Sequence, residues 1–515
     1  MRGGSTVALY SVVELPFTGP ATPVPADRTP LTVTFAHEGG HVVEVPGFWD
    51  GADRYLARFA PEVEGRWTWS SASDVPRLAG RSGELAVGPA EPGEHGPVRV
   101  AGTFHLAHAD GTPFRPVGAT VYNWLHQDEP LFSETVDAIA GAGLNKLRFM
   151  VFPQAGGYVE HFPELLPFER GADGRYDVSR PVVEYFRRLD AAVRLLQARG
   201  VQADVLIYNA YDNARFGLDT LTEDEDAAYL RYLVARLSAY PNVWWSLCNE
   251  FDLLDRPTAR WDRAGELLAA TDPHEHLRSV HNWVRLYDYN KPWVTHASIQ
   301  LGQATEDVGR ASLFRDAYRK PIVLDEIKYE GDVPERWGHL TPQQLVHQFW
   351  IATVSGCYAS QGESFTLENG SLHIVQGGPL RGESPPRLGF LRGLLEQVDG
   401  AGLDPIDGWW DDGFVVGVPG STYLQYLGRR SPATWTFRLP QGRWGARLET
   451  GDRFEVDVID TWNMTVTPVG RTFELTDVRR NEAFAGDAAP VRLPAGEALA
   501  VRVRRSGPAA PTSTT

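Results

Sequence analysis

Cysteine is scarce in this sequence. Only Cys248 and Cys357 occur in 515 residues, and one possible pair cannot build the disulfide framework of a small secreted domain. We expect both to be buried small hydrophobic residues rather than nucleophiles. Cysteine usage therefore gives no support for secretion.

Positive charge and long apolar runs are also scarce. Lys and Arg number 49 against 66 Asp and Glu, giving a formal net charge of −17, whereas nonspecific binding to nucleic acid or an anionic membrane needs the opposite sign. No stretch reaches the roughly 18 apolar residues of a membrane span, and the N-terminus lacks the pattern of a secretory signal. These absences predict a soluble, cytoplasmic protein with no nucleic-acid or membrane partner.

Cofactor motifs are missing as well. No glycine pattern of the Walker or dinucleotide type stands between a predicted strand and a predicted helix, so no nucleotide cofactor is expected. Homo-oligomer formation is possible and is left open.

The sequence does contain ample material for large cores. The hydrophobic residues make up 43% of the chain and the charged residues 22%, with 16 Trp, 18 Tyr and 23 Phe, which indicates a folded protein. At roughly 150 residues per domain, the length predicts two or three domains.

Both ends of the chain have the pattern of β-structure. Short runs that alternate apolar and polar residues, such as Leu31–Phe35, fill the first hundred residues, and similar runs begin again at Phe414–Val418. This pattern is typical of β-sandwiches. We predict an N-terminal β-sandwich over 1–105, a C-terminal β-sandwich over 401–506, and a disordered tail over 507–515.

The central segment, 106–400, alternates apolar runs rich in Val, Ile and Leu with stretches at helical spacing, which indicates βα units and a parallel sheet. Eight strands are predicted, at 116–121, 145–151, 203–208, 243–248, 278–282, 293–299, 321–326 and 356–360. Helices are predicted at 131–142, 181–199, 223–239, 261–270, 307–318, 341–354 and 387–399. This set fits an α/β (β/α)8 TIM barrel, which we favour over a doubly wound sheet. The weak point is the fifth connection, since Trp283 to Pro292 is too short for a full crossover helix.

Two glutamates end predicted strands of this barrel. Glu250 ends the fourth strand and Glu326 ends the seventh, and catalytic groups of such barrels come from the C-terminal ends of different strands. Glycosidic cleavage needs two carboxyl groups, one to protonate the leaving oxygen and one to attack the anomeric carbon or activate water. Either acid alone could be a solvated surface residue, but the pair points to a glycosidase.

The residues around these two acids resemble glycoside hydrolase clan A, the retaining (β/α)8 glycosidases. The resemblance rests on Asn249-Glu250 after a Val-Trp-Trp-Ser strand and on Glu326 after Ile-Val-Leu-Asp. It implies that Glu250 is the acid/base, that Asn249 holds the sugar 2-hydroxyl, and that Glu326 is the nucleophile.

The whole chain resembles a three-part group of bacterial candidate glycoside hydrolases with a sandwich on each side of a clan A barrel. The matching stretches are Val45–Gly51, Arg58–Pro61, Gly65–Trp69 and Glu455–Thr465. The likeness covers nearly the whole chain. It implies glycoside hydrolysis but does not define which sugar is the substrate.

Other predicted strand ends supply supporting residues. Arg148 stands where clan A members place an Arg beside the nucleophile, and a nearby cation would lower the pKa of Glu326. A structural salt bridge within the barrel is the alternative for Arg148. His281 and Asn282 end strand five. His296 lies in strand six, where the clan often has a Tyr on the nucleophile, so His296 is the best substitute; a buried His is nearly as good an interpretation of His281 and His296.

Aromatic and amide side chains at three further strand ends suit a sugar, because rings stack on sugar faces and amides bind hydroxyls. We predict substrate contacts from Tyr122, Asn123, Trp124, Asn209, Tyr211, Asp212, Gln361 and Glu363. The aromatic residues could equally be core residues, and Glu363 could be a surface-loop acid.

The function predicted from the sequence is a retaining glycoside hydrolase without cofactor, exo-acting on small oligosaccharides or glycosides. One alternative is a carbohydrate-binding barrel that has lost catalysis. A metal-dependent barrel hydrolase is a weaker alternative, since the predicted strand one offers no His-x-His and strand eight no Asp for metal ligation.

Overall fold

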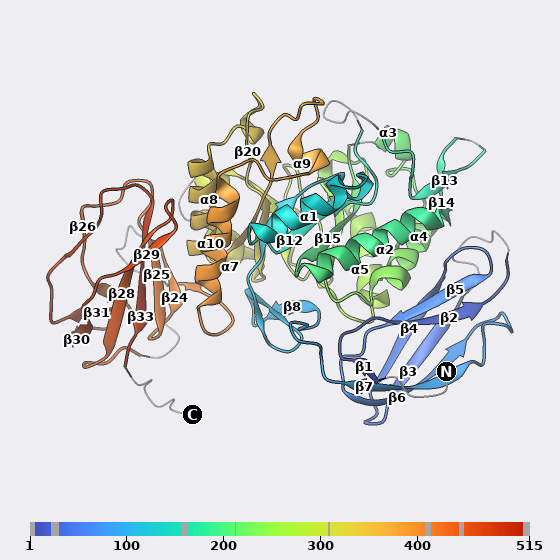
Figure 1. Cartoon of the computed structure of the whole chain (residues 1–515), viewed down its shortest axis with the longest axis horizontal. Helices are drawn as coiled ribbons and strands as arrows, with labels where there is room; N and C mark the ends of the chain where they lie inside the picture. Colours follow the sequence, from blue (N-terminus) through green and yellow to red (C-terminus); the bar gives the residue numbers. More distant parts are fainter. Residues whose placement is uncertain are drawn as a thin grey trace.

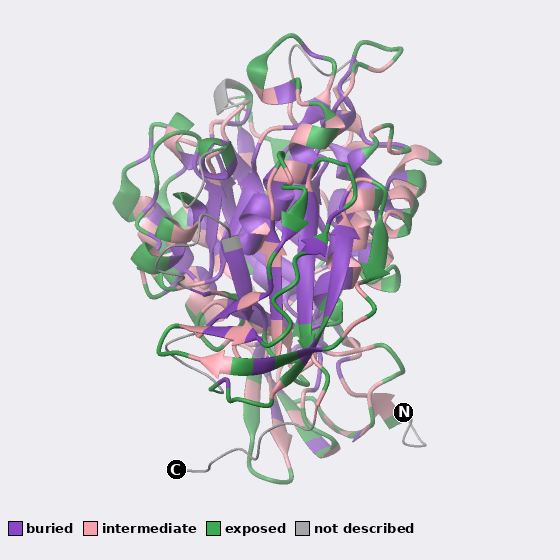
Figure 2. Ribbon diagram, turned by 90° about the vertical axis from the view of Figure 1, so that its left-hand side faces the viewer, coloured by how far each residue is buried: buried purple, intermediate pink, exposed green. Residues whose placement is uncertain are grey.

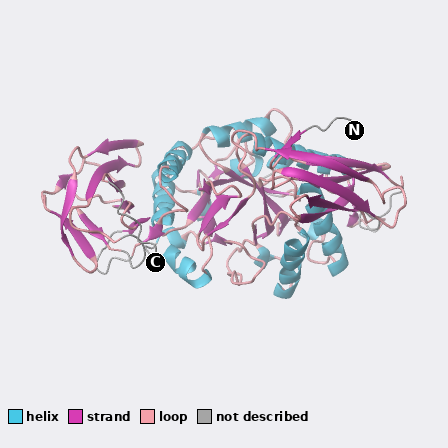
Figure 3. Ribbon diagram, turned by 90° about the horizontal axis from the view of Figure 1, so that it is seen from below, coloured by secondary structure: helices cyan, strands magenta, loops and turns pink. Residues whose placement is uncertain are grey.

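The computed structural model describes residues 6–21, 30–155, 162–172, 174–211, 213–306, 310–406, 414–441 and 447–507. A central barrel lies between an N-terminal β domain and a C-terminal β domain (Figure 1; Figure 3 gives the view from below). The all-β character predicted for both flanks is confirmed. Apart from Gly507, the tail predicted to be disordered lies outside the described residues.

The N-terminal domain is a seven-stranded sheet in the order β1-β7-β6-β3-β4-β5-β2. Its core contains Val33, Phe35, Phe59 and Trp67. Around Val33, Phe35 and Trp67 the buried residues alternate with more exposed ones, as expected for strands buried on one face. The strands are β1 (Thr6–Ala8), β2 (Val13–Thr18), β3 (Thr32–His37), β4 (Val42–Trp49), β5 (Arg54–Phe59), β6 (Gly65–Ala72) and β7 (Ser82–Gly88).

A three-stranded sheet connects this domain to the barrel. It comprises β8 (Val98–Ala101), β9 (His105–His108) and β10 (Pro113–Phe114). Val98, Leu106 and Phe114 form an apolar cluster with Trp244 and Val323 from barrel strands. Because Trp244 and Val323 lie near the starts of their strands, this small sheet covers the N-terminal end of the barrel and leaves the other end for the site.

The predicted eight-stranded barrel is confirmed. Its parallel strands follow the order β17-β16-β15-β12-β11-β21-β19-β18, and a parallel bridge between His281 and Ser298 joins the two edges. The strands are β11 (Val117–Thr120), β12 (Lys146–Met150), β15 (Gln202–Asn209), β16 (Val243–Asn249), β17 (Arg278–Ser279), β18 (Ala297–Gln300), β19 (Ile322–Glu326) and β21 (Tyr358–Gln361). They are almost entirely buried (Figure 2), as expected for parallel strands covered on both faces.

Helices cover the outside of the barrel. The principal ones are α1 (Leu131–Gly141), α2 (Val183–Ala198), α4 (Glu223–Leu237), α5 (Thr258–Thr271), α7 (Arg310–Tyr318), α8 (Pro342–Val354) and α10 (Ser384–Glu396). Thr222 and Thr341 form capping boxes with Glu225 and Gln344, which satisfies amides at the starts of α4 and α8. Residues 280–296, between β17 and β18, contain no helix, in agreement with the short fifth connection.

Short elements surround the barrel mouth. They are β13 (Phe168–Arg170), β14 (Tyr176–Pro181), α3 (Asn213–Phe216), α6 (Gln303–Glu306), α9 (His373–Gln376), the parallel pair β20 (Glu330–Gly331) and β22 (Glu363–Ser364), and 3-10 turns at Trp124–His126, Phe251–Leu253 and Arg336–Gly338. Among the described residues, none of the helices is both long and apolar enough to cross a membrane.

The C-terminal domain is built on a sheet in the order β23-β24-β25-β33-β28-β30-β31-β27, with β29 paired to β28 and a separate pair of β26 and β32. It packs on α8, where Trp350 stacks on Tyr426 with ring centroids 5.4 Å apart. The strands are β23 (Asp404–Pro405), β24 (Phe414–Val418), β25 (Thr422–Tyr426), β26 (Thr434–Trp435), β27 (Arg438–Pro440), β28 (Arg453–Asp460), β29 (Thr465–Pro468), β30 (Phe473–Val478), β31 (Glu482–Ala485), β32 (Val491–Arg492) and β33 (Leu499–Arg505).

A buried ionic network joins the N-terminal domain to the barrel. Arg58 of β5 donates to Asp190 of α2 at 2.8 Å, and Arg236 of α4 donates to the same carboxylate oxygen at 2.8 Å. Arg236 also lies 3.1 Å from Asp50 of the N-terminal domain. Each buried charge therefore has a partner across the junction, which fixes the domain on the outside of the barrel.

Candidate active site

Both predicted catalytic acids lie at the barrel mouth. Glu326 is the last residue of β19 and Glu250 directly follows β16; their exposed fractions are only 4% and 6%. Glu250 has a φ of +55°, in the left-handed region that non-glycine residues rarely adopt. At Glu250 the chain leaves the strand and enters the Phe251–Leu253 turn.

Three groups converge on one carboxylate oxygen of Glu326. The Tyr122 hydroxyl donates to Oε1, Arg148 Nη1 donates to Oε1 at 3.1 Å, and His281 Nε2 lies 3.5 Å from it. Burial alone would raise the pKa of Glu326, but His281 in its protonated form, Arg148 and Tyr122 together lower it to about 2. Glu326 is therefore ionised at neutral pH.

Glu250 has the opposite electrostatic environment. Burial and the negative charge of Glu326 raise its pKa to about 8, although hydrogen bonds with Tyr211 and Gln300 partly oppose the shift. Glu250 is therefore mostly protonated at neutral pH. A protonated and an ionised carboxyl group at one barrel mouth can act as acid and nucleophile.

Arg148 links the nucleophile side of the site to the acid side. Its Nη2 donates to Asn249 Oδ1 at 2.8 Å, and Asn249 Nδ2 donates to the Tyr211 hydroxyl at 2.8 Å. Arg148 therefore fixes the amide of Asn249, which precedes Glu250. Its Nε also lies within 4 Å of the carboxylates of Asp204 and Asp325. Arg148 therefore both forms ion pairs inside the barrel and contacts the nucleophile.

A buried ionic cluster supports the floor of the site. Lys146 Nζ lies 2.7 Å from both Asp204 and Asp325, and the hydroxyls of Ser298 and Ser360 donate to Asp325 at 2.6 and 2.7 Å. Burial would raise the pKa of Asp325, but Lys146 and Arg148 hold it well below its usual range. Asp325, the neighbour of Glu326, is therefore a fixed negative charge.

Several predicted site residues are brought together. Tyr122, Tyr211 and His281 surround the two acids as described. Asn282 acts one step away, because its side chain accepts from the Gln300 backbone N–H at 3.1 Å and donates to the Gln300 carbonyl at 3.2 Å. Asn282 therefore positions Gln300, whose side chain reaches Glu250.

Other predicted contacts are occupied by the protein itself. Asn123 bonds the backbone of Gln154 with both ends of its amide, and Asn209 donates to the Phe152 carbonyl and accepts from the Tyr211 N–H. Trp124 is fully buried and stacks on Phe132, so the core alternative holds for it. Asp212 lies outside the described residues.

The prediction for His296 is wrong. His296 precedes β18, and the next residue pairs with Ile322 at the start of β19, whereas Glu326 ends β19 opposite Gln300. The ring packs against Trp244 at the covered end of the barrel, and burial lowers its pKa to about 3. Tyr122 and His281 contact the nucleophile instead.

The strand-eight acid Glu363 holds a loop. Its two carboxylate oxygens accept from the backbone N–H groups of Arg381 and Gly382 at 2.8 and 3.0 Å, while the neighbouring Glu330 accepts from those of residues 383 and 384. Burial raises the pKa of Glu363 to about 7. Gln361 ends β21, and its Oε1 is buried with no hydrogen-bond partner within the described part of the chain.

Sequence reasoning missed two site residues. Gln300 ends β18 and contacts Glu250, and its place at a strand end could have indicated it. Tyr329 is buried near Tyr122 and Glu326, in an apolar cluster with Tyr211 and Trp337. It lies three residues beyond its strand, where no sequence pattern marks it.

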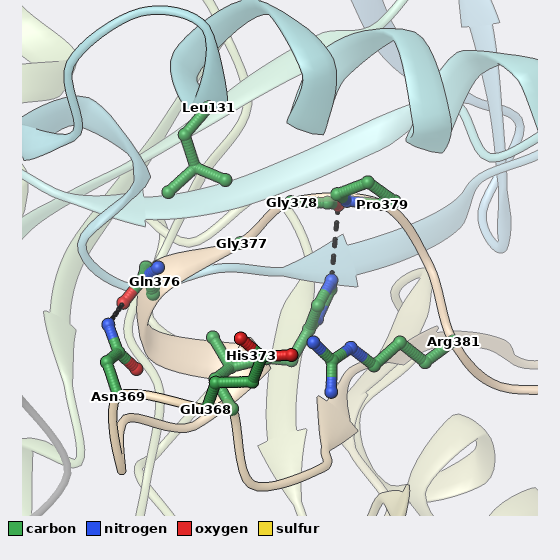
Figure 4. Close-up of a pocket in the computed structure, with 10 residues that line it drawn as sticks. Leu131, Glu368, Asn369, His373, Gln376, Gly377, Gly378, Pro379 and Arg381 are labelled. Carbon is green, nitrogen blue, oxygen red and sulfur yellow. Dashed lines mark hydrogen bonds between the residues drawn. The ribbon is translucent and has the colours of Figure 1, made fainter.

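A cavity of about 300 Å³ lies beside the mouth (Figure 4). It is lined by polar side chains of His373, Gln376 and Arg381 and by Leu131 at the start of α1. The carbonyls of Ile374 and Val375 in α9 accept from the backbone N–H groups of residues 122 and 123. The helix that lines this cavity therefore also fixes the loop that carries Tyr122.

Comparison with known proteins agrees with this geometry. Residues 101–362 match the family described as "Apiosidase-like, catalytic domain", and residues 6–74 and 409–504 match two domains of unknown function, DUF5060 and DUF5605. A candidate glycoside hydrolase from Bacteroides vulgatus ATCC 8482 is 33% identical, covers 97% of this chain and 99% of its own, and superposes with a TM-score of 0.91. No curated protein matches the chain.

A more distant structure shares the fold alone. The glycoside hydrolase family 5 protein from the same organism is 16% identical, covers 80% of this chain and 93% of its own, and has a TM-score of 0.57. The barrel with its paired acids, the family match and the similar glycoside hydrolase define the class of this protein as a glycoside hydrolase. Within that class, the chain belongs to the apiosidase-like family.

Proposed function

We propose that the protein is a retaining glycosidase in which Glu326 is the nucleophile and Glu250 the acid/base. The observation that carries this proposal is that the pKa values of two buried carboxyl groups are shifted in opposite directions. Cationic and hydroxyl donors keep Glu326 ionised, while burial and the charge of Glu326 keep Glu250 protonated. Double displacement needs these two states at the start of the reaction.

The contacts of Glu326 also suggest which oxygen attacks. Tyr122, Arg148 and His281 all approach Oε1, and none of the contacts found among the described residues involves Oε2. In the first step Oε2 bonds to the anomeric carbon, the glycosidic C–O bond breaks, and the Glu250 proton passes to the leaving oxygen. The product is a glycosyl ester of Glu326 and an ionised Glu250.

The second step reverses the role of Glu250. Once Glu326 is esterified, the negative charge that raised the pKa of Glu250 is gone, so its pKa falls and the carboxylate can act as a base. Glu250 takes a proton from water, the oxygen of that water bonds to the anomeric carbon, and the ester bond to Glu326 breaks. The sugar leaves with its original anomeric configuration.

The substrate class is proposed from the family description and from the enclosure of the site. Because the family is described as apiosidase-like, apiosides are the first substrates to test. The slight exposure of both acids and the aromatic residues Tyr122, Tyr211 and Tyr329 around them support exo action on a single terminal sugar of a small glycoside.

An activity screen tests this proposal. Aryl glycosides, including apiosides and common pyranosides and furanosides, are incubated with the full chain, and NMR identifies the anomer that forms first. We expect turnover of at least one glycoside with retention, and loss of that turnover in Glu326→Ala. Glu363→Gln is the matched control, because it also changes a buried acid near the mouth but leaves both catalytic carboxyls in place.

Three outcomes would contradict the proposal. Sugar binding without turnover of any glycoside would favour the carbohydrate-binding alternative, and a first-formed anomer of inverted configuration would remove Glu326 from the role of nucleophile. Near-normal turnover by Glu326→Ala would do the same.

A further inference from the structure

His281 contacts the nucleophile with a nitrogen that has no hydrogen-bond partner. Its Nε2 is buried, lies 3.5 Å from Glu326 Oε1, and makes no hydrogen bond within the described part of the chain. Its other nitrogen, Nδ1, lies 3.0 Å from the Ser298 hydroxyl. Which nitrogen carries the proton decides whether His281 can donate to Glu326.

The hydrogen bonds of Ser298 settle this assignment. Asp325 is ionised, because Lys146 Nζ lies 2.7 Å from it in a fully buried pair, so it can only accept. The Ser298 hydroxyl lies 2.6 Å from Asp325 Oδ2 and must donate its single proton to that oxygen. Ser298 Oγ can then only accept from His281, which places the proton of a neutral His281 on Nδ1 and leaves a lone pair on Nε2 toward Glu326.

The charges around His281 indicate where an additional proton would go. Among the residues that the structure describes, three buried carboxylates, those of Asp204, Asp325 and Glu326, lie within 4 Å of two cations, Lys146 and Arg148. One more proton would neutralise the group. At Nε2 that proton would form an N–H donor directed at Glu326 and would place a cation against the nucleophile.

We propose that Ser298 and Asp325 make His281 the first proton acceptor of the nucleophile's pocket: Nδ1 keeps the resident proton, and a proton entering the pocket binds at Nε2 and leaves Glu326 ionised. This role rests on the proposed function, in which Glu326 must stay ionised to attack. His281 is a positioning residue in this scheme, since it acts through Glu326 and is fully buried.

The surroundings of His281 indicate that its ring gains a second proton only in acid. Burial and the Arg148 guanidinium of β12 lower the pKa of His281, while Glu326 and Asp325 of β19 oppose that shift. The ring is therefore neutral at neutral pH and gains its second proton below its usual pKa. The 3.5 Å separation without a hydrogen bond fits this neutral form.

The barrel contains a matched pair of serines for the test. Ser298 and Ser360 both donate to Asp325, at 2.6 and 2.7 Å, from the strands β18 and β21 on either side of β19. Of the two, Ser298 is the one that contacts His281. Ser298→Ala and Ser360→Ala therefore remove equivalent bonds to Asp325, but the first also releases Nδ1 of His281. Ser298→Val also lacks a hydrogen-bonding group and serves if Ser298→Ala does not fold.

The direct measurement is ¹⁵N NMR of the full chain labelled at histidine, with the His281 signals assigned by their loss in His281→Gln. We expect Nδ1–H with unprotonated Nε2 at neutral pH, and protonation of Nε2 on acidification, in the unmodified chain and in Ser360→Ala. In the Ser298 variants we expect Nε2–H at neutral pH. An Nε2–H tautomer in the unmodified chain, or the same tautomer in all variants, would overturn the proposal.

The pH profile supplies the functional measurement. In the Ser298 variants, the neutral His281 ring can donate its Nε2–H to Glu326. A second proton would then have to bind at Nδ1, which has lost its partner, so the ring does not supply a positive charge beside Glu326 in acid. The acid limb of kcat/KM should therefore move upward by about one to three pH units in the Ser298 variants and stay in place in Ser360→Ala. Equal shifts in both would overturn the proposal. The NMR measurement needs no turnover, so an inactive protein with the expected tautomer would refute the proposed function and leave the tautomer assignment standing.

Discussion

Replacing the nucleophile should lower the pKa of the acid/base. Glu326→Gln removes one of the two main causes that raise the pKa of Glu250, namely the negative charge of Glu326, and leaves the other cause, burial, in place. At the roughly 5.3 Å separation of a retaining pair and an effective dielectric constant of about 20, the repulsion is about 3 kcal/mol. This corresponds to about 2 pKa units, so the pKa of Glu250 should fall from about 8 to roughly 6, and it should stay above that of a free carboxyl because burial remains.

The assay is ¹³C NMR of the full chain labelled at the glutamate carboxyl carbon, followed over pH. The Glu250 signal is assigned by its loss in Glu250→Gln. Asp252→Asn is the matched control, because Asp252 also raises the pKa of Glu250 but ranks below burial and Glu326 among the causes; a clearly smaller shift is expected. An unchanged or raised Glu250 pKa in Glu326→Gln would refute the electrostatic account of the site.

Three further outcomes are expected. The unmodified enzyme should lose kcat/KM above about pH 8, measured on its best glycoside, because Glu250 must be protonated to act as acid; a flat profile to pH 10 would contradict this. Tyr122→Phe removes a hydrogen bond to an ionised carboxylate and should lower kcat roughly 10- to 100-fold, whereas Tyr329→Phe, whose hydroxyl has no hydrogen-bond partner found in the described part of the chain, should have a much smaller effect. Asp190→Ala leaves two buried guanidinium groups without this carboxylate and should lower the free energy of unfolding, measured with denaturant, by about 3–5 kcal/mol. Asp137→Ala, which removes one partner of an exposed ion pair, should lower it by less than about 1 kcal/mol.

The barrel and its two acids could be predicted because buried parallel strands have a simple sequence signature. Runs such as Val243–Asn249 and Ile322–Glu326 are apolar along most of their length and end in polar residues. The C-terminal ends of such strands meet at one mouth whatever the detailed register. The positions of Glu250 and Glu326 therefore follow from strand assignment alone.

The error at His296 arose from the boundaries of a strand. The sequence predicts strand six at 293–299, whereas β18 covers Ala297–Gln300 and pairs with β19 from Ile322 onward. A shift of a few residues moves a side chain from one end of the barrel to the other. Apolar residues on both faces give no alternation that would fix the register in advance.

The remaining differences come from the hydrogen-bonding needs of the backbone. Asn123, Asn209 and Glu363 satisfy main-chain groups of distant loops, because buried backbone polar groups must be paired. The sequence shows that such residues stand at strand ends, but not whether their partner is a sugar hydroxyl or a loop amide 18 or more residues away.

Covalent trapping tests the central claim most directly. The full chain is incubated with a 2-fluoro derivative, carrying a reactive leaving group, of the sugar that the activity screen identifies, and the modified peptide is located by mass spectrometry. The account predicts one added glycosyl unit on Glu326 and none in Glu326→Gln. A glycosyl unit attached to a different residue, with Glu326 unmodified, would contradict it.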